Sequence, residues 1–234
     1  MSPLTSSELE RLRPSGLVYL VGALRTRQDV YRWCQALRQW QPPRAPLRVH
    51  MEHNSLDEHA AAEILEAVGG TVQAVYLHHN EIRDMEPLGT FIEKHSETLQ
   101  ELHLSHNRLY TAETKALLLQ IGCTRLSSDA TETTSSCSWL RLEFNYIDVA
   151  ELMRNLPPPI RQRIQLDDCG CTPGRCYCKR RRYLKRIHCK LLAMQRAIPP
   201  EDRPQRHQLQ SEAAARQGRL QLDHEPREDS GTAI

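Results

Sequence analysis

Four asparagines recur in nearly the same local sequence, and this repetition restricts the possible fold more than any other feature of the chain. The four segments are Val49-His50-Met51-Glu52-His53-Asn54-Ser55-Leu56, Val75-Tyr76-Leu77-His78-His79-Asn80-Glu81-Ile82, Leu102-His103-Leu104-Ser105-His106-Asn107-Arg108-Leu109 and Leu140-Arg141-Leu142-Glu143-Phe144-Asn145-Tyr146-Ile147. The asparagines are 26, 27 and 38 residues apart. Before each one, apolar residues alternate with other residues, which predicts a short strand with inward apolar side chains. The sequence therefore predicts an array of similar units.

Helical segments follow these strands. Residues 57–68 are rich in alanine and end at Gly69-Gly70, and Thr111–Ile121 ends at Gly122, as helices commonly do. Asp148 and Glu151 have the spacing of a capping box that opens a third helix. A strand and a helix in every unit predict an α/β fold with a parallel sheet. Upstream, a strand within 16–22 and a helix within 26–40 predict a degenerate first unit.

The segments resemble the leucine-rich repeat, whose signature is L-x-x-L-x-L-x-x-N/C-x-L. Their length and their helices resemble the ribonuclease-inhibitor-like subclass. The resemblance implies a short right-handed solenoid with a parallel sheet on the concave face and helices on the convex face. It implies that the asparagines form a buried structural ladder, made of Asn54, Asn80, Asn107 and Asn145. It also implies a fifth unit at 164–171, with Cys169 in the asparagine position.

The chain divides into four regions on this basis. Residues 1–46 are expected to form the degenerate N-terminal repeat or cap, and residues 47–168 the leucine-rich-repeat solenoid. A Ser/Thr-rich insertion at 123–136 lengthens the last interval between asparagines, because eight of the 13 residues from 124 to 136 are Ser or Thr. We expect a Cys-rich turn and a basic capping helix at 169–198. The polar segment 199–234 is expected to be a disordered tail.

Composition limits the setting of the protein. Charged residues make up 26% of the chain, and it lacks the apolar run of about 18 residues that a membrane span requires. A secretory pattern is also missing from the first residues, which predicts a cytoplasmic protein, with the nucleus as an alternative. In such a reducing compartment the eight cysteines are expected to be thiols or metal ligands. The sequence does not indicate an oligomeric state.

The residues between the inward strand positions are candidates for a binding surface, because the resemblance places them on the concave face. The candidates are His50, His53, Tyr76, His78, His79, His103, His106, Arg141 and Phe144. Repeat proteins commonly bind partners on this face, and these residue types suit such contacts. A row of histidines could also bind a metal or phosphate, although histidine before this asparagine is ordinary for the family. Since catalytic motifs such as G-x-S-x-G and H-E-x-x-H are missing, we expect a non-enzymatic scaffold that binds a protein partner.

A cysteine cluster is the candidate metal site. Cys169, Cys171, Cys176 and Cys178 lie within ten residues, and four thiolates can bind zinc tetrahedrally. Both pairs are spaced C-x-C, however, and paired zinc ligands usually have two to four residues between them. Core burial of Cys169 and Cys171 in the fifth unit is the alternative. No cofactor is therefore predicted, with zinc kept as an alternative.

A basic run near the C-terminus supports a different function. Residues 175–196 contain nine Lys or Arg and no Asp or Glu, which leaves 22 basic and 29 acidic residues elsewhere. The run includes Lys179, Arg180, Arg181, Arg182, Lys185 and Arg186. Leu184, Ile187 and Leu191 have helical spacing, which predicts a capping helix with a solvated basic face. The alternative is a surface that binds RNA or another polyanion, as in an RNA- or ribonucleoprotein-associated factor.

Overall fold

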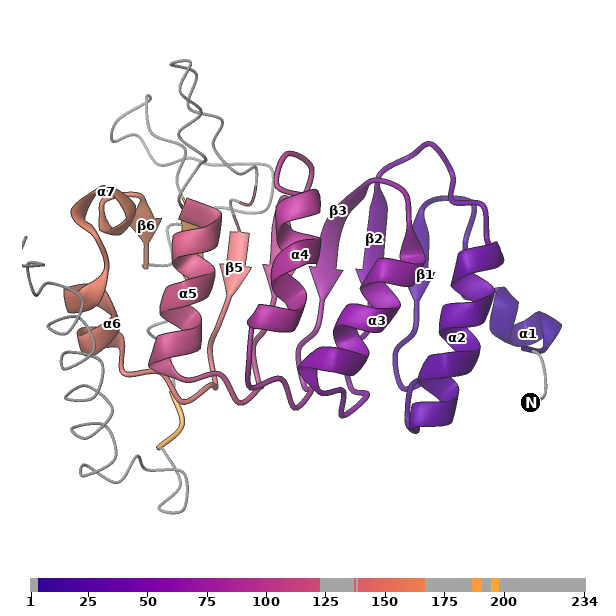
Figure 1. Cartoon of the computed structure of the whole chain (residues 1–234), viewed down its shortest axis with the longest axis horizontal. Coiled ribbons are helices and arrows are strands. Elements are labelled where there is room, and N and C mark those ends of the chain that lie inside the picture. Colours follow the sequence, from indigo (N-terminus) through magenta and orange to yellow (C-terminus); the bar gives the residue numbers. More distant parts are fainter. Residues whose placement is uncertain (1–3, 123–136, 138, 167–186, 191–194, 198–234) are drawn as a thin grey trace, which may run out of the picture. The chain divides into compact units, whose positions relative to one another are not determined.

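The protein is an α/β structure in which parallel strands alternate with helices. The computed structural model describes residues 4–122, 137, 139–166, 187–190 and 195–197 (Figure 1). Its helices are α1 (Ser6–Leu9), α2 (Arg27–Gln39), α3 (Glu58–Val68), α4 (Glu86–Lys94), α5 (Thr111–Gly122), α6 (Val149–Asn155) and α7 (Pro158–Arg161). Its strands are β1 (Leu17–Tyr19), β2 (Leu47–His50), β3 (Val72–Tyr76), β4 (Glu101–His103), β5 (Trp139–Arg141), β6 (Ile164–Gln165) and β7 (Ile187–Lys190).

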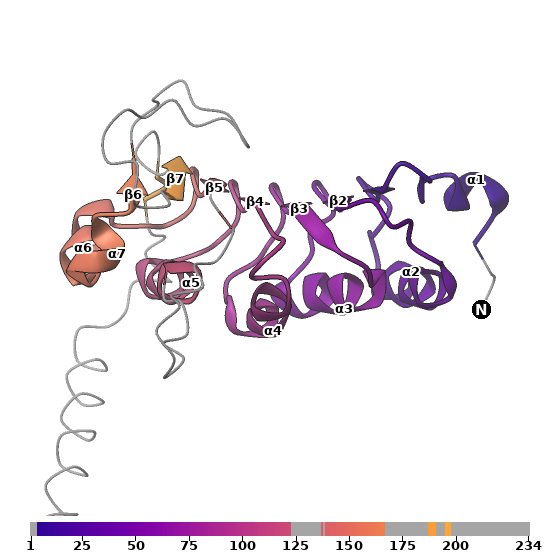
Figure 2. The ribbon, with the colours of Figure 1, turned by 90° about the horizontal axis from the view of Figure 1, so that it is seen from above.

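All seven strands belong to one sheet, in the order β1-β2-β3-β4-β5-β7-β6, and every named pair of strands is parallel. Helices α2, α3, α4 and α5 lie side by side on one face of this sheet (Figure 2). The predicted alternation of strand and helix is therefore confirmed, including the strand and helix of the first unit. No described helix is long and apolar enough to cross a membrane.

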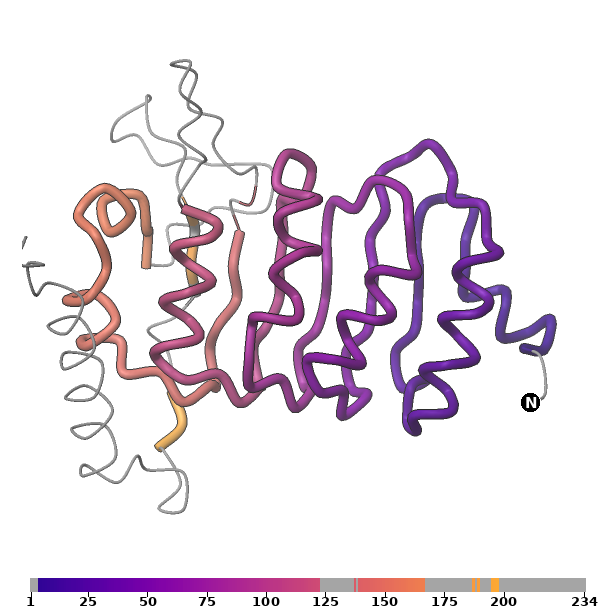
Figure 3. Tube along the Cα trace, in the orientation of Figure 1, coloured from indigo at the N-terminus to yellow at the C-terminus, as the bar shows by residue number. Residues whose placement is uncertain are grey.

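Helix boundaries follow from their capping residues. The Thr26 and Asp29 side chains form a capping box at the start of α2, and Asp57 and Asp148 accept backbone N–H bonds at the starts of α3 and α6. Gly69 ends α3 with φ +62°, a conformation that glycine adopts without steric strain. Successive units can be followed along the chain trace (Figure 3).

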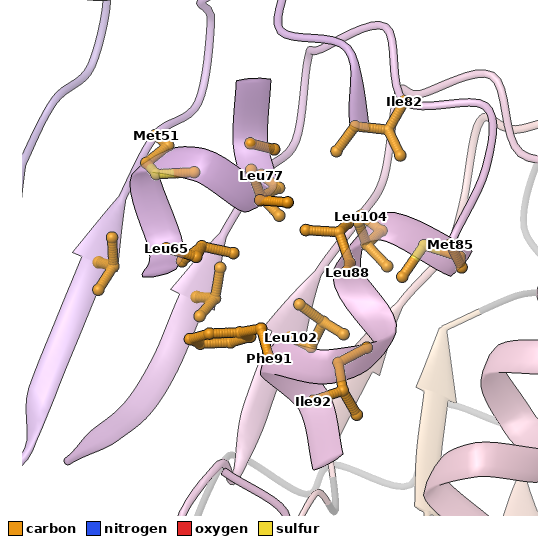
Figure 4. Close-up of a cluster of buried hydrophobic side chains, with 14 of the residues drawn as sticks. Met51, Leu65, Leu77, Ile82, Met85, Leu88, Phe91, Ile92, Leu102 and Leu104 are labelled. Atoms are coloured by element: carbon orange, nitrogen blue, oxygen red, sulfur yellow. The ribbon is translucent and has the colours of Figure 1, made fainter. Parts of the chain in front are cut away.

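Alternation along the strands fills the core between the sheet and its helices. Val18, Val49, Val75, Leu102 and Leu140 are in register on adjacent strands and are almost fully buried. Met51, Leu77 and Leu104 lie in the same apolar cluster, together with Leu65 of α3 and Leu88 and Phe91 of α4 (Figure 4). One core thus joins neighbouring units, so a single unit has no separate core of its own.

The four asparagines are buried and form hydrogen bonds that link adjacent units, as predicted. We call Asn54, Asn80, Asn107 and Asn145 the asparagine column. The Asn107 Nδ2 group donates to the carbonyl oxygens of Leu77 and Leu104, at 2.9 and 3.1 Å, while its Oδ1 accepts the Ile82 N–H at 3.1 Å. The other three asparagines repeat this pattern. The column thereby satisfies backbone groups that would otherwise be buried without a partner.

The C-terminal end of the sheet departs from the prediction in the order of its strands. The predicted fifth unit would place the strand at Ile164 beside β5, but β7 lies there, and β6 pairs with β7. Cys169, which was expected to continue the column, lies outside the described residues, and among the described residues it is Gln195 that bonds next to Asn145. Its Oε1 accepts the Asn145 N–H at 3.2 Å and its Nε2 donates to the Leu142 carbonyl oxygen at 3.4 Å.

The predicted basic capping helix is wrong over residues 187–190. Residues 187–190 form β7, in which Ile187 and Cys189 are buried and Cys189 is in register with Leu140. Apolar residues at 184, 187 and 191 fit a helical period, but 187 and 189 also fit the period of a strand. Pairing with β5 decides between these patterns for so short an apolar segment. The rest of the run, from Lys179 to Arg186, lies outside the described residues.

Candidate functional site: stacked rings on the open face of the sheet

One ring from each of four successive units forms a continuous stack. We call these residues, His53, His79, His106 and Phe144, the ring column. Neighbouring ring centroids are 4.3, 3.9 and 4.1 Å apart, and neighbouring planes are inclined by 14°, 21° and 24°. The spacing follows from the strands, which are about 4.8 Å apart in a parallel sheet. The row of histidine rings predicted from the sequence is therefore present, and Phe144 extends it.

The backbone conformation of the ring column is the same in every unit. His53, His79, His106 and Phe144 all have positive φ, between 56° and 62°. Residues with a side chain rarely adopt this conformation, and surrounding structure must stabilise it. Here the next residue is a member of the asparagine column in each case, so the buried amide hydrogen bonds hold the turn. The ring column consequently depends on the asparagine column for its alignment.

A second set of rings lies on the strands themselves. Tyr19, His50, Tyr76 and His103 are in register on β1 to β4. The rings of His50 and Tyr76 are stacked at 4.1 Å, and those of Tyr76 and His103 meet edge to face at 4.6 Å. Tyr19 lies next to His50, with a centroid distance of 5.9 Å. Tyr19 is not among the residues predicted from the sequence, although the alternation of Leu17-Val18-Tyr19 places it on this face.

Glu101 is a buried carboxylate between these rings. Its Oε1 accepts the Tyr76 hydroxyl at 3.0 Å and lies 2.8 Å from His103 Nε2, and its Oε2 lies 3.4 Å from Arg48 Nη2. Burial alone would raise the pKa of Glu101, but these contacts outweigh it and lower the pKa below its usual value. Glu101 is therefore ionised, and Arg48, His103 and Tyr76 stabilise its buried negative charge on this face of the sheet.

Two further carboxylates lie next to the ring column, one at each end. Glu143 Oε1 accepts bonds from Nε and Nη2 of Arg141, at 2.8 and 2.5 Å, and Glu52 Oε1 lies 3.0 Å from His50 Nδ1. Burial opposes ionisation of Glu52, but the hydrogen bonds from His50 and from its own backbone lower its pKa overall. The carboxylates are thus held by groups of the same face.

Three histidines of this face, His78, His79 and His106, have lowered pKa values and so resist protonation. Loss of hydration, followed by the proximity of His106 and His53, lowers the pKa of His79 to about 4. Loss of hydration also lowers the pKa values of His78 and His106, although Glu52 and Glu143 partly oppose the shift. Charged imidazoles at stacking distance would repel one another. Near pH 7 the centre of the ring column is therefore a neutral aromatic surface.

The predicted partner-binding residues differ in how accessible they are. His53 and His79 are exposed, and His106 and Phe144 are half-buried. Tyr76 and His103 are each only 8% exposed, so they position Glu101 and offer little contact area. Tyr19, in contrast, is 39% exposed. His50, His78 and Arg141 are also half-buried, so the accessible part of the predicted surface is the ring column with these three side chains beside it, and Tyr19 is added from β1.

The histidine row does not have the arrangement of a metal site. Within the described part of the chain, no group of three or more His, Cys, Asp or Glu side chains has the geometry of a metal site. The ring column presents the faces of its rings to one another, so its nitrogens do not converge. Cys169, Cys171, Cys176 and Cys178 lie outside the described residues, whereas Cys34, Cys137 and Cys189 are buried thiols.

Comparison with known proteins does not identify a relative. The chain matches no protein-family model, no curated protein and no solved structure.

Proposed function

We propose that the chain is a leucine-rich-repeat protein of the ribonuclease-inhibitor-like kind, and that it acts as a non-enzymatic scaffold for a protein partner. The asparagine column supports the family assignment, because one buried amide per unit bonds the backbone of the unit before it. The solenoid, with the open sheet face as its concave side, belongs to the same proposal. Helices α2 to α5 lie on the opposite face (Figure 2).

The ring column is the observation that carries the proposed binding function. Four rings at nearly equal spacing form a rigid strip, so a partner would immobilise few additional side chains on binding. Truncated aromatic side chains commonly weaken protein association by 2 kcal/mol or more at the centres of interfaces. The partner is therefore expected to contact the strip formed by His53, His79, His106 and Phe144.

Substitution of the strip tests the proposal. We expect Phe144→Ala to weaken partner binding by roughly 1–3 kcal/mol while the fold survives. Tyr76→Ala, which would release the buried Glu101, is a poorer test because it also disturbs the sheet face. The measurement is retention of a partner by immobilised full-length chain, with the affinity of the identified partner then determined in solution. Tyr31→Ala, at an exposed aromatic on α2, is the matched control.

The alternative, binding of RNA or another polyanion through the basic run, gives the opposite result in the same experiment. Charge reversal at Lys179, Arg181 and Lys185 would abolish binding, and Phe144→Ala would have no effect. Binding would also weaken steeply with salt, because phosphate contacts release counterions. That combination would contradict the scaffold proposal.

A further inference from the structure

At the β1 end, the ring column stops one unit before the sheet does. Gly22 lies two residues after the buried Leu20, just as His53 lies two residues after the buried Met51. Leu20 corresponds to Met51, because Asn54 and Asn80 donate to their respective carbonyl oxygens. Gly22 has φ +62°, and His53 has φ +59°. The first unit therefore repeats the backbone position that carries a ring in the next four units, but it has no side chain there.

The position at Gly22 is open. A Cβ atom built on Gly22 would meet no atom within 4 Å. His53, the adjacent member of the column, is exposed, and its ring contacts among the described residues are with His78 and His79. Since His79 stacks on His53 from the β3 side, the side of His53 toward β1 faces the place that a ring on Gly22 would fill.

We propose that this place is a binding site for an aromatic side chain of a protein partner, which stacks on His53 above Gly22. The proposal rests on the proposed function and adds the chemistry of the partner. An aromatic ring would continue the stack at the spacing of its other members, and stacked rings attract one another beyond their buried area. The site is thus a gap in a repeating pattern, next to a ring that is already positioned.

The neighbouring charge selects among planar groups. The Arg25 side chain is held beside the gap by a hydrogen bond of 3.1 Å from its Nε to the Gly22 carbonyl oxygen. An arginine of the partner would also be planar, but its positive charge would meet that of Arg25. An aromatic ring avoids this repulsion and can accept a cation–π contact from the guanidinium. The structure therefore favours Trp, Tyr or Phe over Arg as the occupant.

The gap can be filled from within the chain, which provides a direct test. Gly22→His would place a fifth ring in the column, and Gly22→Ala would place a Cβ atom at the same positive φ without a ring. N-acetyltryptophanamide is the probe, and the ring signals of His53 are followed by NMR during titration. We expect a saturable upfield shift in the unsubstituted protein and in Gly22→Ala. In Gly22→His the apparent affinity should fall about fivefold or more, as expected for the loss of one aromatic contact.

Several results would overturn the proposal. These are the absence of a saturable shift at His53, equal binding by Gly22→His and Gly22→Ala, or a larger effect with N-acetylargininamide. Tighter binding of adenosine monophosphate would indicate a nucleobase and would likewise overturn it. Both variants carry a side chain at positive φ and should lose a similar amount of stability, so cooperative thermal unfolding at the same temperature in the two variants establishes that they share an intact fold. If Phe144→Ala releases the partner and Gly22→His does not, the aromatic site is wrong while the proposed function stands.

Discussion

The asparagine column and the ring column are adjacent in sequence and opposite in environment. Asn107 is fully buried and bonds four backbone groups, whereas His79 and His53 are exposed and stacked. In each unit, the side chain that links neighbouring units directly follows the side chain that faces outward. The same turn, repeated in each unit, therefore forms both the buried asparagine column and the outward-facing ring column.

Removal of a member of the asparagine column tests whether this line stabilises the fold. We expect Asn107→Ala to lower the free energy of unfolding by about 3 kcal/mol, because several buried backbone groups lose their partner. Chemical denaturation of the purified chain measures the change. Asn107→Asp is the informative second variant, since it keeps an acceptor for the Ile82 N–H but loses the Nδ2 donors. Equal stability of Asn107→Ala and the unsubstituted chain would show that the asparagine column does not stabilise the fold.

Gln195 tests where the asparagine column ends. Replacement by alanine removes the acceptor of the Asn145 N–H, so we expect a loss of about 1 kcal/mol and faster hydrogen exchange at that amide. Gln195→Glu keeps an acceptor oxygen and should preserve more of the protection than alanine does. Unaltered exchange at Asn145 in both variants would mean that Gln195 does not continue the column.

Truncation of a ring should have a smaller effect than truncation of an asparagine. His79→Ala removes two stacked contacts, with His53 and His106, and we expect it to lower the unfolding free energy by about 1 kcal/mol or less. His59, an exposed histidine on α3, provides the matched control His59→Ala. A loss of unfolding free energy as large as that of Asn107→Ala would show that the ring column also stabilises the fold, which would contradict our interpretation.

Acid should destabilise the folded chain in part through the ring column. The pKa of His79 falls from 6.5 to about 4 in the folded chain, so the unfolded chain binds more protons between these values. The contribution of neutral His79 to the free energy of unfolding is therefore fully present above pH 6.5 and decreases as the pH falls toward 4. The lowered pKa values of His78 and His106, and that of the buried His95 outside the ring column, act in the same direction.

Unfolding free energies at pH 7 and pH 5 measure this dependence, because Glu52 and Glu101 with lowered pKa values remain ionised over that interval. His79→Phe keeps the ring but does not titrate, so its stability should depend less on pH than that of the unsubstituted chain. His59→Phe is the control on α3. Identical pH dependence of all three proteins would contradict the assignment.

The first edge of the sheet shows how much local sequence can specify. Leu12 pairs with Val18 in antiparallel fashion, and the N–H groups of Arg13 and Tyr19 bond the carbonyl oxygens of Leu17 and Arg11. The segment before β1 thereby covers the backbone of that edge, which would otherwise be free to pair with another chain. The strand was predictable from its apolar run, but this cover was not, because nothing in the residues 11–13 indicates a pairing partner.

The sequence by itself determined the repeating units, because each unit packs against the unit that follows it along the chain. Alternating apolar residues predict β2 to β5, capping residues and glycines predict α3, α5 and α6, and the recurring asparagines predict the column. Because each unit packs on its sequence neighbour, a pattern read locally also specifies the parallel sheet. The histidine row follows from the same register.

Only the tertiary structure decided the contacts between distant segments and the exposure of side chains. The strand next to β5 is β7, which begins at Ile187, 46 residues after β5 ends at Arg141, rather than β6, which is nearer in the sequence. Local periodicity does not encode such a long-range choice, so both Gln195 and the strand at Ile187 were missed. The burial of Tyr76 and the open place beside His53 likewise depend on neighbours in space. A one-dimensional pattern gives the direction of a side chain, whereas its accessibility depends on what packs around it.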